Sequence, residues 1–351
     1  MKILITGNLG YVGPGVIKEF RKHYPHAELI GYDCGYFMLQ NTTNLISPEI
    51  YLDKQIFGDV RDFDPSLLEG VDTVVSLAAI SNDPIGNKFE EPTLAINYHS
   101  TINIAKAAKA AGVKNFVFAS SCSVYGFASD VPRTEDSELN PLTAYAKSKV
   151  YSENDLALLA DDNFKITCLR FATACGMSDR LRLDLVINDF VAGAIVNNKI
   201  EILSDGTPWR PLINVLDMAR AIRWAHEREI SNGGTFLIVN TGSNHWNYQV
   251  EELAFAVQEL LEDVDVSINQ NAAPDKRSYR VNFDLFEKLA PNHQPKHDLK
   301  ITVRELILGL HSIDFKDINY RNAKLIRLYI INQLLESKCI NPNLYVNNLL
   351  K

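Results

Sequence analysis

Ile3-Leu-Ile-Thr-Gly-Asn-Leu-Gly-Tyr-Val-Gly13 lies near the start of the chain and is typical of a strand, a glycine turn and the start of a helix. Three glycines at this spacing after an apolar run predict a dinucleotide-binding turn. Gly7 makes the turn, Gly10 lets the backbone approach a pyrophosphate, and Gly13 lets helix and strand pack closely. The phosphates are expected at the N-terminus of the helix. Because glycine turns end many ordinary strands, a purely structural turn is the alternative.

Asp33 is a second indication of a nucleotide site. It ends the next apolar run, about 20 residues after the last glycine of the turn. A carboxylate at this place accepts hydrogen bonds from the adenosine ribose hydroxyls and repels a 2′-phosphate, which favours NAD over NADP. An ordinary turn residue at the end of a strand is the alternative interpretation.

Tyr145 and Lys149 are a third indication. They lie in Tyr145-Ala-Lys-Ser-Lys149, and residues four apart on a helix project from one face. The ammonium can then hold the phenol near ionisation, so that the pair moves a proton at neutral pH. A proton shuttle beside a dinucleotide site indicates hydride-transfer chemistry.

Composition limits the class of protein. The chain has 351 residues, of which 46% are hydrophobic and 22% charged, as expected for a globular chain with one large domain or two. A formal net charge of −8 argues against general binding to nucleic acid or to anionic membranes. Anionic ligands must therefore be bound locally, by glycine turns and individual arginines.

The cysteines and the N-terminus indicate the compartment. Five widely scattered cysteines without paired ligand spacing predict neither a zinc site nor a disulfide framework. The N-terminus lacks the apolar core of a signal peptide, and no run approaches the roughly 20 apolar residues of a membrane span. We therefore expect a cytoplasmic protein without a bound metal.

Short apolar runs and helical patterns alternate along the first half of the chain. This alternation predicts a Rossmann-type, doubly wound parallel sheet of the α/β class. The expected strands span residues 2–6, 28–33, 55–58, 73–77, 115–120 and 165–170. The expected helices span residues 11–23, 93–111 and 143–160.

Beyond residue 172 the pattern becomes mixed. Helices are expected over residues 185–196, 215–228 and 250–262, and short strands over 199–203 and 235–240. They predict a smaller α+β lobe over the carboxyl edge of the sheet, where ligands bind in such folds. The expected domains are residues 1–172 for the dinucleotide, residues 173–317 mainly for the substrate and partly interleaved with the first domain, and a helical C-terminal extension over 318–351 that packs on its own or a partner subunit.

Together these motifs resemble the extended short-chain dehydrogenase/reductase family, in particular its nucleotide-sugar epimerase and dehydratase branch, typified by UDP-galactose 4-epimerase. The resemblance extends to about residue 310. Besides the glycine turn and the Tyr145/Lys149 pair, it rests on Gly58-Asp-Val-Arg-Asp62, Leu77-Ala-Ala79, Asn97, Ser120-Ser-Cys-Ser-Val-Tyr-Gly126 and Asp205-Gly-Thr-Pro-Trp-Arg-Pro-Leu-Ile-Asn-Val-Leu-Asp217.

The resemblance implies NAD as the cofactor and indicates which residues bind it. Asp59 and Val60 are expected to flank the adenine, and Ala78 and Ala79 to line the cofactor channel. The full expected set is Gly7, Gly10, Tyr11, Val12, Gly13, Asp33, Asp59, Val60, Leu77, Ala78, Ala79, Asn97, Ser120, Tyr145 and Lys149.

The resemblance also implies Ser121 as the third catalytic residue. Lys149 would bind the nicotinamide ribose and lower the pKa of Tyr145, whose phenolate would accept the sugar hydroxyl proton while a hydride leaves the same carbon. Ser121 would hydrogen-bond the reacting oxygen, whereas Cys122 would point to the other face of the extended segment and pack. Return of the hydride to the opposite face would give an epimer and leave the cofactor unchanged overall.

The residues after Ser121 favour one reaction. Dehydratases of the branch carry an acidic residue there, whereas this chain has Cys122 and Ser123, which are poor acids and bases at neutral pH. We therefore expect an NAD-dependent epimerase acting at C4 of a nucleotide-diphosphate sugar. An NAD(P)H-dependent ketosugar reductase with the same three residues is the main alternative. A 4,6-dehydratase and a non-enzymatic NAD-binding regulator are the others.

Arginines of the second half are candidate clamps for the substrate pyrophosphate, because a guanidinium offers two donors at once. The resemblance favours Arg210 and Asn188. Thr173 stands where many relatives have asparagine, which leaves the identity of the sugar open. The expected substrate-binding set is Ser121, Ser123, Thr173, Arg180, Arg182, Asn188, Arg210, Arg277 and Arg280, with an ambiguous alignment of the last two arginines.

A homodimer is also expected. In relatives, the helices that correspond to residues 93–111 and 143–160 form a four-helix bundle between two subunits. The second helix carries Val150, Leu156 and Leu159 among its polar residues, and a packed bundle would bury them.

Overall fold

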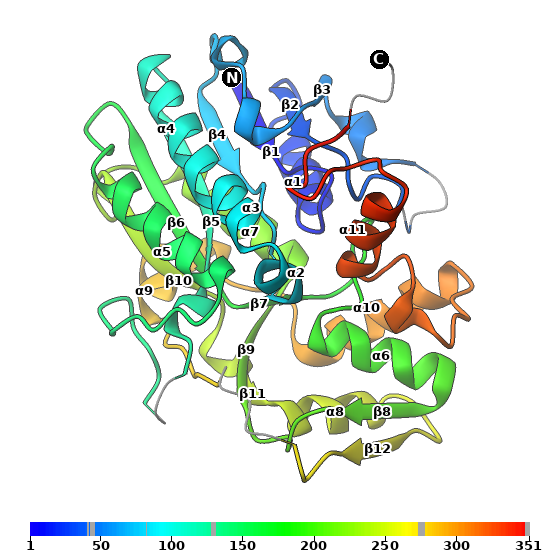
Figure 1. Ribbon diagram of the computed structural model, residues 1–351. Coiled ribbons are helices and arrows are strands. Elements are labelled where there is room, and N and C mark those ends of the chain that lie inside the picture. The colour runs from blue at the N-terminus through cyan, green and yellow to red at the C-terminus, as the bar shows by residue number, and fades with distance from the viewer. Residues whose placement is uncertain (41, 43–45, 82, 128–130, 273–277, 348–351) are drawn as a thin grey trace.

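The computed structural model describes residues 1–351 except 41, 43–45, 82, 128–130, 273–277 and 348–351 (Figure 1). Its centre is an all-parallel sheet with the strand order β10 (Phe236–Thr241), β6 (Lys165–Phe171), β5 (Asn115–Ser121), β4 (Thr73–Ser76), β1 (Lys2–Thr6), β2 (Glu28–Asp33) and β3 (Lys54–Phe57). The helices are α1 (Gly13–His23), α2 (Asp83–Lys88), α3 (Glu90–Leu94), α4 (Ser100–Ala110), α5 (Ala144–Ala157), α6 (Val186–Asn197), α7 (Val215–Glu227), α8 (Val250–Gln258), α9 (Asp284–Leu289), α10 (Leu299–Ser312) and α11 (Arg327–Glu336). The Rossmann-type fold predicted from the sequence is confirmed.

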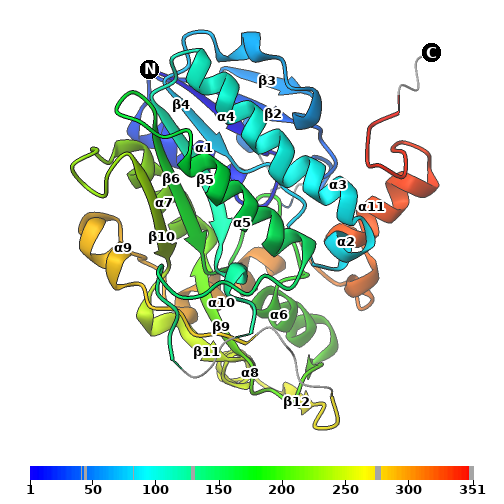
Figure 2. The same cartoon turned by 60° about the vertical axis from the view of Figure 1, so that its left-hand side comes forward.

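Successive side chains of the central strands enter opposite layers of the protein. Ile3 and Ile5 of β1 pack with α1 and α7 on one face of the sheet. Leu4 between them packs with α4 and α5 on the other face. All three are fully buried, which explains why this strand is a continuous apolar run rather than an alternating one. Figures 1 and 2 show helices over both faces.

A smaller lobe lies beyond the carboxyl ends of the strands (Figure 1). One of its sheets contains β7 (Thr173–Cys175), β9 (Trp209–Asn214) and β11 (Asn247–Gln249), and the other pairs β8 (Lys199–Ile202) with β12 (Asp265–Ile268). Helices α6, α8 and α10 pack together around a separate core. The expected α+β lobe is therefore present.

Two elements differ from their expected positions or extents. The strand expected in the smaller lobe at residues 235–240 is β10, which pairs with β6 and completes the large sheet. The helix expected over residues 93–111 is divided, because a π-helical turn at Ala95–His99 joins α3 to α4. Asn97 lies inside this turn with its side chain bonded to Ile80. Such turns are frequent where a helix carries a residue with a specific task.

Helix ends also differ from the prediction. Helix α1 begins at Gly13 rather than at residue 11, because the glycine turn occupies the preceding residues. Helices α5 and α8 end at Ala157 and Gln258, before the expected residues 160 and 262. Strand β5 reaches Ser121, whose side chain caps the short 3₁₀ helix that follows.

The C-terminal extension is only partly helical. Helix α11 is followed by turns and an isolated bridge between Ile340 and Val346. Ile331, Ile340 and Leu344 are buried in the same core cluster as Leu4 of β1. The extension therefore packs on the dinucleotide domain of its own subunit, and both views place α11 beside α2 (Figures 1 and 2). None of the helices in the described part of the chain is long and apolar enough to cross a membrane.

Candidate active site

A cavity of about 740 Å³ lies where the carboxyl edge of the large sheet meets the smaller lobe and the C-terminal extension. The predicted site residues on its wall are Gly7, Gly10, Tyr11, Val12, Asp33, Asp59, Val60, Leu77, Ala78, Ala79, Ser120, Ser121, Ser123, Tyr145, Lys149, Thr173, Arg182 and Arg210. The predicted residues that lie off its wall are Gly13, Asn97, Arg180, Asn188 and Arg280. Arg277 lies outside the described residues.

The glycine turn is too tight for side chains on its inner side. Gly7 has a φ of +75°, and a Cβ there would lie 2.4 Å from the backbone nitrogen of Ala78. A Cβ on Gly13 would lie 2.0 Å from the carbonyl oxygen of Asn8. Gly10, in contrast, lines the cavity, and a Cβ there would meet only the Gly7 carbonyl oxygen, at 3.2 Å. The backbone at the start of α1 is thus open to a pyrophosphate, which fits NAD.

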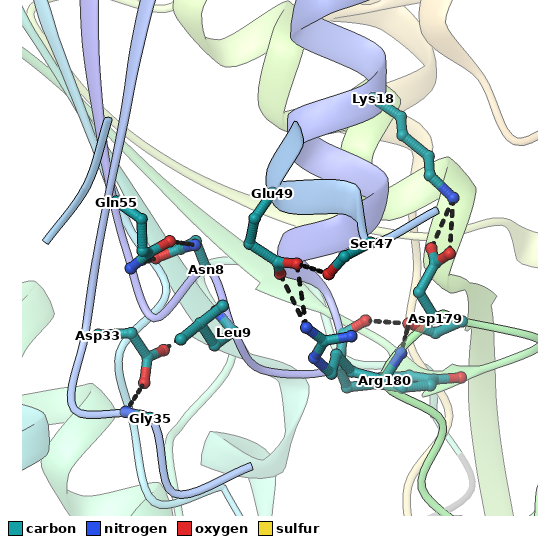
Figure 3. A network of polar contacts seen from close by, with 12 residues as sticks. Asn8, Leu9, Lys18, Asp33, Gly35, Ser47, Glu49, Gln55, Asp179 and Arg180 are labelled. Atoms are coloured by element: carbon teal, nitrogen blue, oxygen red, sulfur yellow. Dashed lines mark hydrogen bonds and ion pairs between the residues drawn. The ribbon is translucent and has the colours of Figure 1, made fainter. Parts of the chain in front are cut away.

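Asp33 faces the same cavity from the end of β2. Its carboxylate accepts hydrogen bonds from the backbone N–H groups of Gly35 (2.7 Å) and Leu9 (3.1 Å), as Figure 3 shows. Burial raises the pKa of Asp33, and these two hydrogen bonds oppose the rise. The carboxylate is fixed against the turn and retains acceptor capacity for ribose hydroxyls. Behind the turn, the buried Asn8 amide donates to the side-chain oxygen of Gln55 of β3 (2.6 Å; Figure 3), a contact that no sequence motif indicates.

Tyr145 and Lys149 of α5 line the cavity together with Ser121 at the end of β5. The Lys149 ammonium donates to the backbone carbonyl of Ala119 (2.7 Å) and lies 5.4 Å from the centre of the Tyr145 ring. Burial lowers the pKa of Lys149 to about 7, while the negative charge of Glu153 opposes this fall. The lysine can therefore change its protonation state near neutral pH.

Ser121 and Ser123 both face the cavity, from the turn that follows β5. The Ser121 hydroxyl accepts a hydrogen bond from the backbone N–H of Ser123 (3.1 Å). The Ser123 hydroxyl is buried and has no hydrogen-bond partner among the residues that the structure describes. Cys122 is fully buried between them, its thiol donates to the carbonyl of Arg170 (3.1 Å), and burial raises its pKa. A thiol held in this way packs rather than reacts.

A buried ion pair lies behind the predicted catalytic residues, within the protein. Glu153, one helical turn after Lys149, pairs with Arg170 of β6 at 2.7 Å, and both side chains are almost fully buried. Glu153 also accepts a hydrogen bond from the Ser120 hydroxyl (2.5 Å), and Arg170 donates to the Tyr125 hydroxyl (3.0 Å). None of the sequence motifs indicates this network, and its one local signal is the spacing of Glu153 four residues after Lys149.

Asn97 and Asn188, predicted to contact ligands, are fully buried behind the cavity wall. The Asn97 amide accepts from the backbone N–H of Ile80 (2.8 Å) and donates to its carbonyl (3.0 Å). The Asn188 amide donates to the Tyr11 hydroxyl (3.2 Å). Because Ile80 and Tyr11 line the cavity, both amides act on the site by positioning those residues.

The predicted arginines fall into two groups. Arg182 and Arg210 line the cavity. Arg180 turns away from it and pairs with Glu49 at 3.0 Å (Figure 3). The Arg280 guanidinium lies 4.8 Å from the centre of the Trp209 ring and off the cavity wall.

The C-terminal extension contributes wall residues that no motif indicates. Arg321, Ile326 and Arg327 line the cavity. They are held there by long-range contacts, such as the hydrogen bond from the backbone N–H of Leu183 to the carbonyl of Leu325 (2.9 Å). Within the described part of the chain, no group of three or more His, Cys, Asp or Glu side chains could hold a metal ion.

A Rossmann sheet and a smaller lobe, with a cavity between them whose wall carries a glycine turn and the Tyr145/Lys149 pair, form the arrangement of the extended short-chain dehydrogenases/reductases. The family model described as "NAD dependent epimerase/dehydratase family" matches residues 3–240, and the chain belongs to this family. Its cofactor is NAD, and the protein is an enzyme of the nucleotide-sugar epimerase and dehydratase type.

Individual relatives include both kinds of enzyme. The chain is 28% identical over 295 residues to the UDP-glucose 4-epimerase of Haemophilus influenzae, which covers 74% of this chain and 82% of that protein. The solved UDP-glucose 4-epimerase from Brucella ovis in complex with NAD has a TM-score of 0.72 at 23% identity and covers 88% of this chain and 97% of its own. The solved structure of TunA, an NAD-dependent NDP-hexosamine 5,6-dehydratase involved in tunicamycin biosynthesis, has a TM-score of 0.76 at 23% identity. The superposition covers 91% of this chain and 99% of the TunA chain. The fold is therefore common to epimerases and dehydratases, and the side chains of the site must distinguish the two reactions.

Proposed function

We propose that the protein is an epimerase that inverts C4 of a nucleotide-diphosphate sugar. The observation that carries this proposal is the side-chain chemistry around Ser121, which lines one cavity with Tyr145 and Lys149. The next two residues are a buried cysteine and an uncharged serine, and neither can act as the acid or base of water elimination at neutral pH. The relative named UDP-glucose 4-epimerase supports C4 as the reacting carbon.

The mechanism assigns proton transfer to Tyr145 and supporting roles to Lys149 and Ser121. NAD, when bound, supplies the site that accepts and returns the hydride. The Tyr145 phenolate takes the proton of the sugar hydroxyl, and the Lys149 ammonium stabilises that phenolate. Ser121 donates a hydrogen bond to the reacting oxygen and holds it at the tyrosine. After the ketosugar has rotated in the cavity and presents its opposite face, Tyr145 gives the proton back to the same oxygen.

Arg210 is proposed to hold the pyrophosphate of the substrate. It lies on the cavity wall at the smaller lobe, where its Nη1 donates to the carbonyl of Trp209 (2.9 Å). That hydrogen bond fixes the direction of the side chain. A guanidinium fixed in this way can present two donors to phosphate oxygens.

The deciding experiment uses the holoenzyme without added cofactor. It is incubated with a panel of nucleotide sugars in excess over enzyme, and the products are separated and weighed by mass spectrometry. We expect one sugar to be converted into its C4 epimer, of equal mass, over many turnovers. Product formation that stops unless NADH or NADPH is supplied would identify a reductase. A product lighter by one water would identify a dehydratase.

We expect Asp33→Ala to weaken NAD binding by about 10- to 100-fold, because hydrogen bonds to a charged group contribute about 1.5–3 kcal/mol. Discrimination against NADP should fall further, because the charge that repels a 2′-phosphate is removed. The measurement is the ratio of NAD to NADP affinity in binding titrations. Asp33→Asn is the matched control, because it removes the charge and keeps an acceptor for the backbone of Leu9 or Gly35. A wild-type protein that prefers NADP would contradict the assignment.

We also propose a homodimer that forms through the outer faces of α4 and α5. The sequence-based reason for it needs correction, because Leu156 is fully buried and Val150 and Leu159 pack against the subunit's own core clusters. The surface of α5 instead presents Tyr151, whose ring lies 5.6 Å from that of Tyr98.

The dimer prediction is tested by light scattering at micromolar concentration. We expect a dimer for the wild-type protein and a monomer for Tyr151→Lys, because a buried unpaired charge opposes association. Phe255→Lys is the control, since Phe255 on α8 is as exposed as Tyr151 (45% and 43%). A wild-type monomer, or equal effects of the two variants, would refute this interface.

A cytoplasmic location is part of the same proposal. All five cysteines are free thiols, and Cys122, Cys168 and Cys175 are buried. Unpaired cysteines in this number suit a reducing compartment.

A further inference from the structure

The C-terminal extension is a fixed part of the wall of the NAD cavity. Arg327, the first residue of α11, lines the cavity. Two residues earlier, the carbonyl of Leu325 accepts a hydrogen bond from the backbone N–H of Leu183 (2.9 Å). Near the end of the described chain, the Arg61 guanidinium donates to the carbonyl of Leu344 (2.9 Å). The segment that carries Arg327 is thus attached on both sides of α11.

Arg327 is a buried cation with neutral contacts. The residue is 3% exposed. Its guanidinium donates to the side-chain oxygen of Gln40 and to the backbone carbonyl of Arg180 (2.9 Å). It also lies 4.2 Å from the centre of the Phe37 ring. Among the described residues, no carboxylate forms an ion pair with it.

The arginines around Arg327 are neutralised, and it is not. Arg180 and Arg182 each pair with a carboxylate, at 3.0 and 2.7 Å. Asp33 faces the same cavity, but its oxygens accept hydrogen bonds from backbone N–H groups instead of from Arg327. Burial lowers the pKa of Arg327 to about 9, in keeping with the cost of a buried charge without a counter-ion. Asp184 and Asp33 act on this charge from a distance, but none of the described carboxylates forms an ion pair with it. The cavity wall therefore has a positive charge without a directly paired counter-ion.

Hydrogen bonds connect Arg327 to the glycine turn. The Arg180 carbonyl that accepts its hydrogen bond belongs to the loop after β7. In that loop the Ser178 hydroxyl donates to the carbonyl of Tyr11 in the turn (2.7 Å). The other two contacts of Arg327 are with residues that follow β2. Arg327 is thus joined both to the turn that suits a pyrophosphate and to the strand end that suits the adenosine ribose.

We propose that Arg327 binds the diphosphate of the dinucleotide, so that the C-terminal extension completes the cofactor site. The planar guanidinium suits two phosphate oxygens at once. A ligand phosphate would supply the counter-charge that the described residues do not. The diphosphate of the nucleotide sugar offers the same chemistry from a second source, which the experiment separates. The proposal rests on the NAD site and is independent of epimerisation at C4.

The test measures ligand binding rather than turnover. The holoenzyme is exchanged into NADH and titrated with ADP-ribose, adenosine or UDP, and NADH fluorescence is followed. The dissociation constant of each added ligand is calculated with the NADH affinity measured separately for the same protein, because NADH carries the same diphosphate as ADP-ribose. We expect Arg327→Met to weaken ADP-ribose by about 10- to 100-fold, because a charge-assisted contact is lost, and adenosine by less than about twofold. UDP should bind to the wild-type protein and to the variant with equal affinity. Arg327→Gln, which can still bond to Gln40, provides the same comparison if the methionine variant does not fold.

A matched control removes a different cation that contacts α11. Lys88 donates to the side chain of Asn332 (2.8 Å) and lies off the cavity wall. Lys88→Met should leave the affinities for ADP-ribose and adenosine unchanged. Thermal unfolding of the ligand-free proteins controls for the fold, because removal of an uncompensated buried charge should not lower the Tm.

Three results would overturn the proposal. If both Arg327 variants bound ADP-ribose as tightly as the wild-type protein, Arg327 would not contact the diphosphate. A loss confined to UDP would assign Arg327 to the substrate instead of the cofactor. Equal losses for adenosine and ADP-ribose would mean that the side chain shapes the cavity without binding phosphate.

Discussion

Replacement of Tyr145 by phenylalanine is expected to lower turnover by about 10²- to 10⁴-fold, the usual contribution of a positioned general acid–base group. The change removes only the phenolic oxygen, which is the proposed acceptor of the sugar hydroxyl proton. The ring remains, with the Lys149 ammonium 5.4 Å from its centre. The fold and the NAD content should therefore be nearly unchanged, and kcat should fall much more than the affinity for the nucleotide sugar.

The measurement is steady-state turnover with the nucleotide sugar that the wild-type protein converts in the panel experiment, together with the amount of NAD bound per subunit. Tyr151→Phe is the matched control, because it makes the same change on the same helix at a residue off the cavity wall. Lys149→Ala should damage both NAD binding and turnover, since this residue is expected to contact the nicotinamide ribose as well as the tyrosine. Turnover close to wild type in Tyr145→Phe would end the proposed mechanism.

The parts of the site that could be predicted from the sequence are those that local geometry determines. The glycine turn needs small residues at fixed spacing, and the structure shows why, with a positive φ at Gly7 and an open backbone at Gly10. Asp33 follows from its place at a strand end, and the Tyr145/Lys149 pair from the period of one helix. In each case the residues that define the feature are close together in the chain.

Predictions were weaker where the role of a side chain depends on distant partners. Arg180 has the chemistry of a phosphate clamp, but Glu49, far away in the chain, neutralises it outside the cavity. Asn188 has the chemistry of a substrate contact, but its amide donates to Tyr11 of the glycine turn. Spacing alone cannot show whether a polar side chain serves a ligand or the chain itself, because both uses require the same donors.

The C-terminal extension is the clearest example of a feature without a local signal. Arg327 lies on the cavity wall because Ile331, Ile340 and Leu344 of the same extension are buried in the core cluster that contains Leu4 of β1. The corresponding sequence shows a partly apolar tail and no motif. Likewise, the apolar residue Leu156 of α5 faces its own core rather than a second subunit, since amphipathic periodicity does not state what covers the apolar face.

Loss of the Glu153 carboxylate is expected to have the largest effect on stability. Glu153 and Arg170 are 1% and 3% exposed and are joined by an ion pair of 2.7 Å. Removal of one partner of a buried pair leaves an uncompensated charge and costs about 3–5 kcal/mol. Glu153→Gln preserves the shape of the side chain, so the free energy of unfolding in urea should fall by about that amount through the loss of charge.

The same substitution should alter the pH dependence of the reaction. Glu153 opposes the effect of burial on Lys149, whose pKa is already lowered to about 7. Without the carboxylate the pKa of Lys149 falls further. At a given pH, a smaller fraction of Lys149 is then charged than in the wild-type protein. Because the charged form stabilises the Tyr145 phenolate, the limb on which kcat/KM falls with rising pH should move to lower pH.

A double variant separates the loss of charge from the loss of packing. Glu153→Leu combined with Arg170→Met removes both charges and should be more stable than either single variant, because apolar side chains can replace a buried pair at little net cost. It should still show the shifted pH profile, since Lys149 lacks its neighbouring carboxylate in both cases. A Glu153→Gln protein that unfolds within about 1 kcal/mol of wild type, below the range for a broken buried pair, would refute the stabilising role. An unchanged pH profile would refute the coupling to Lys149, because Glu153 is the carboxylate that raises the pKa of this lysine, and the buried Cys168 thiol has a smaller effect in the same direction.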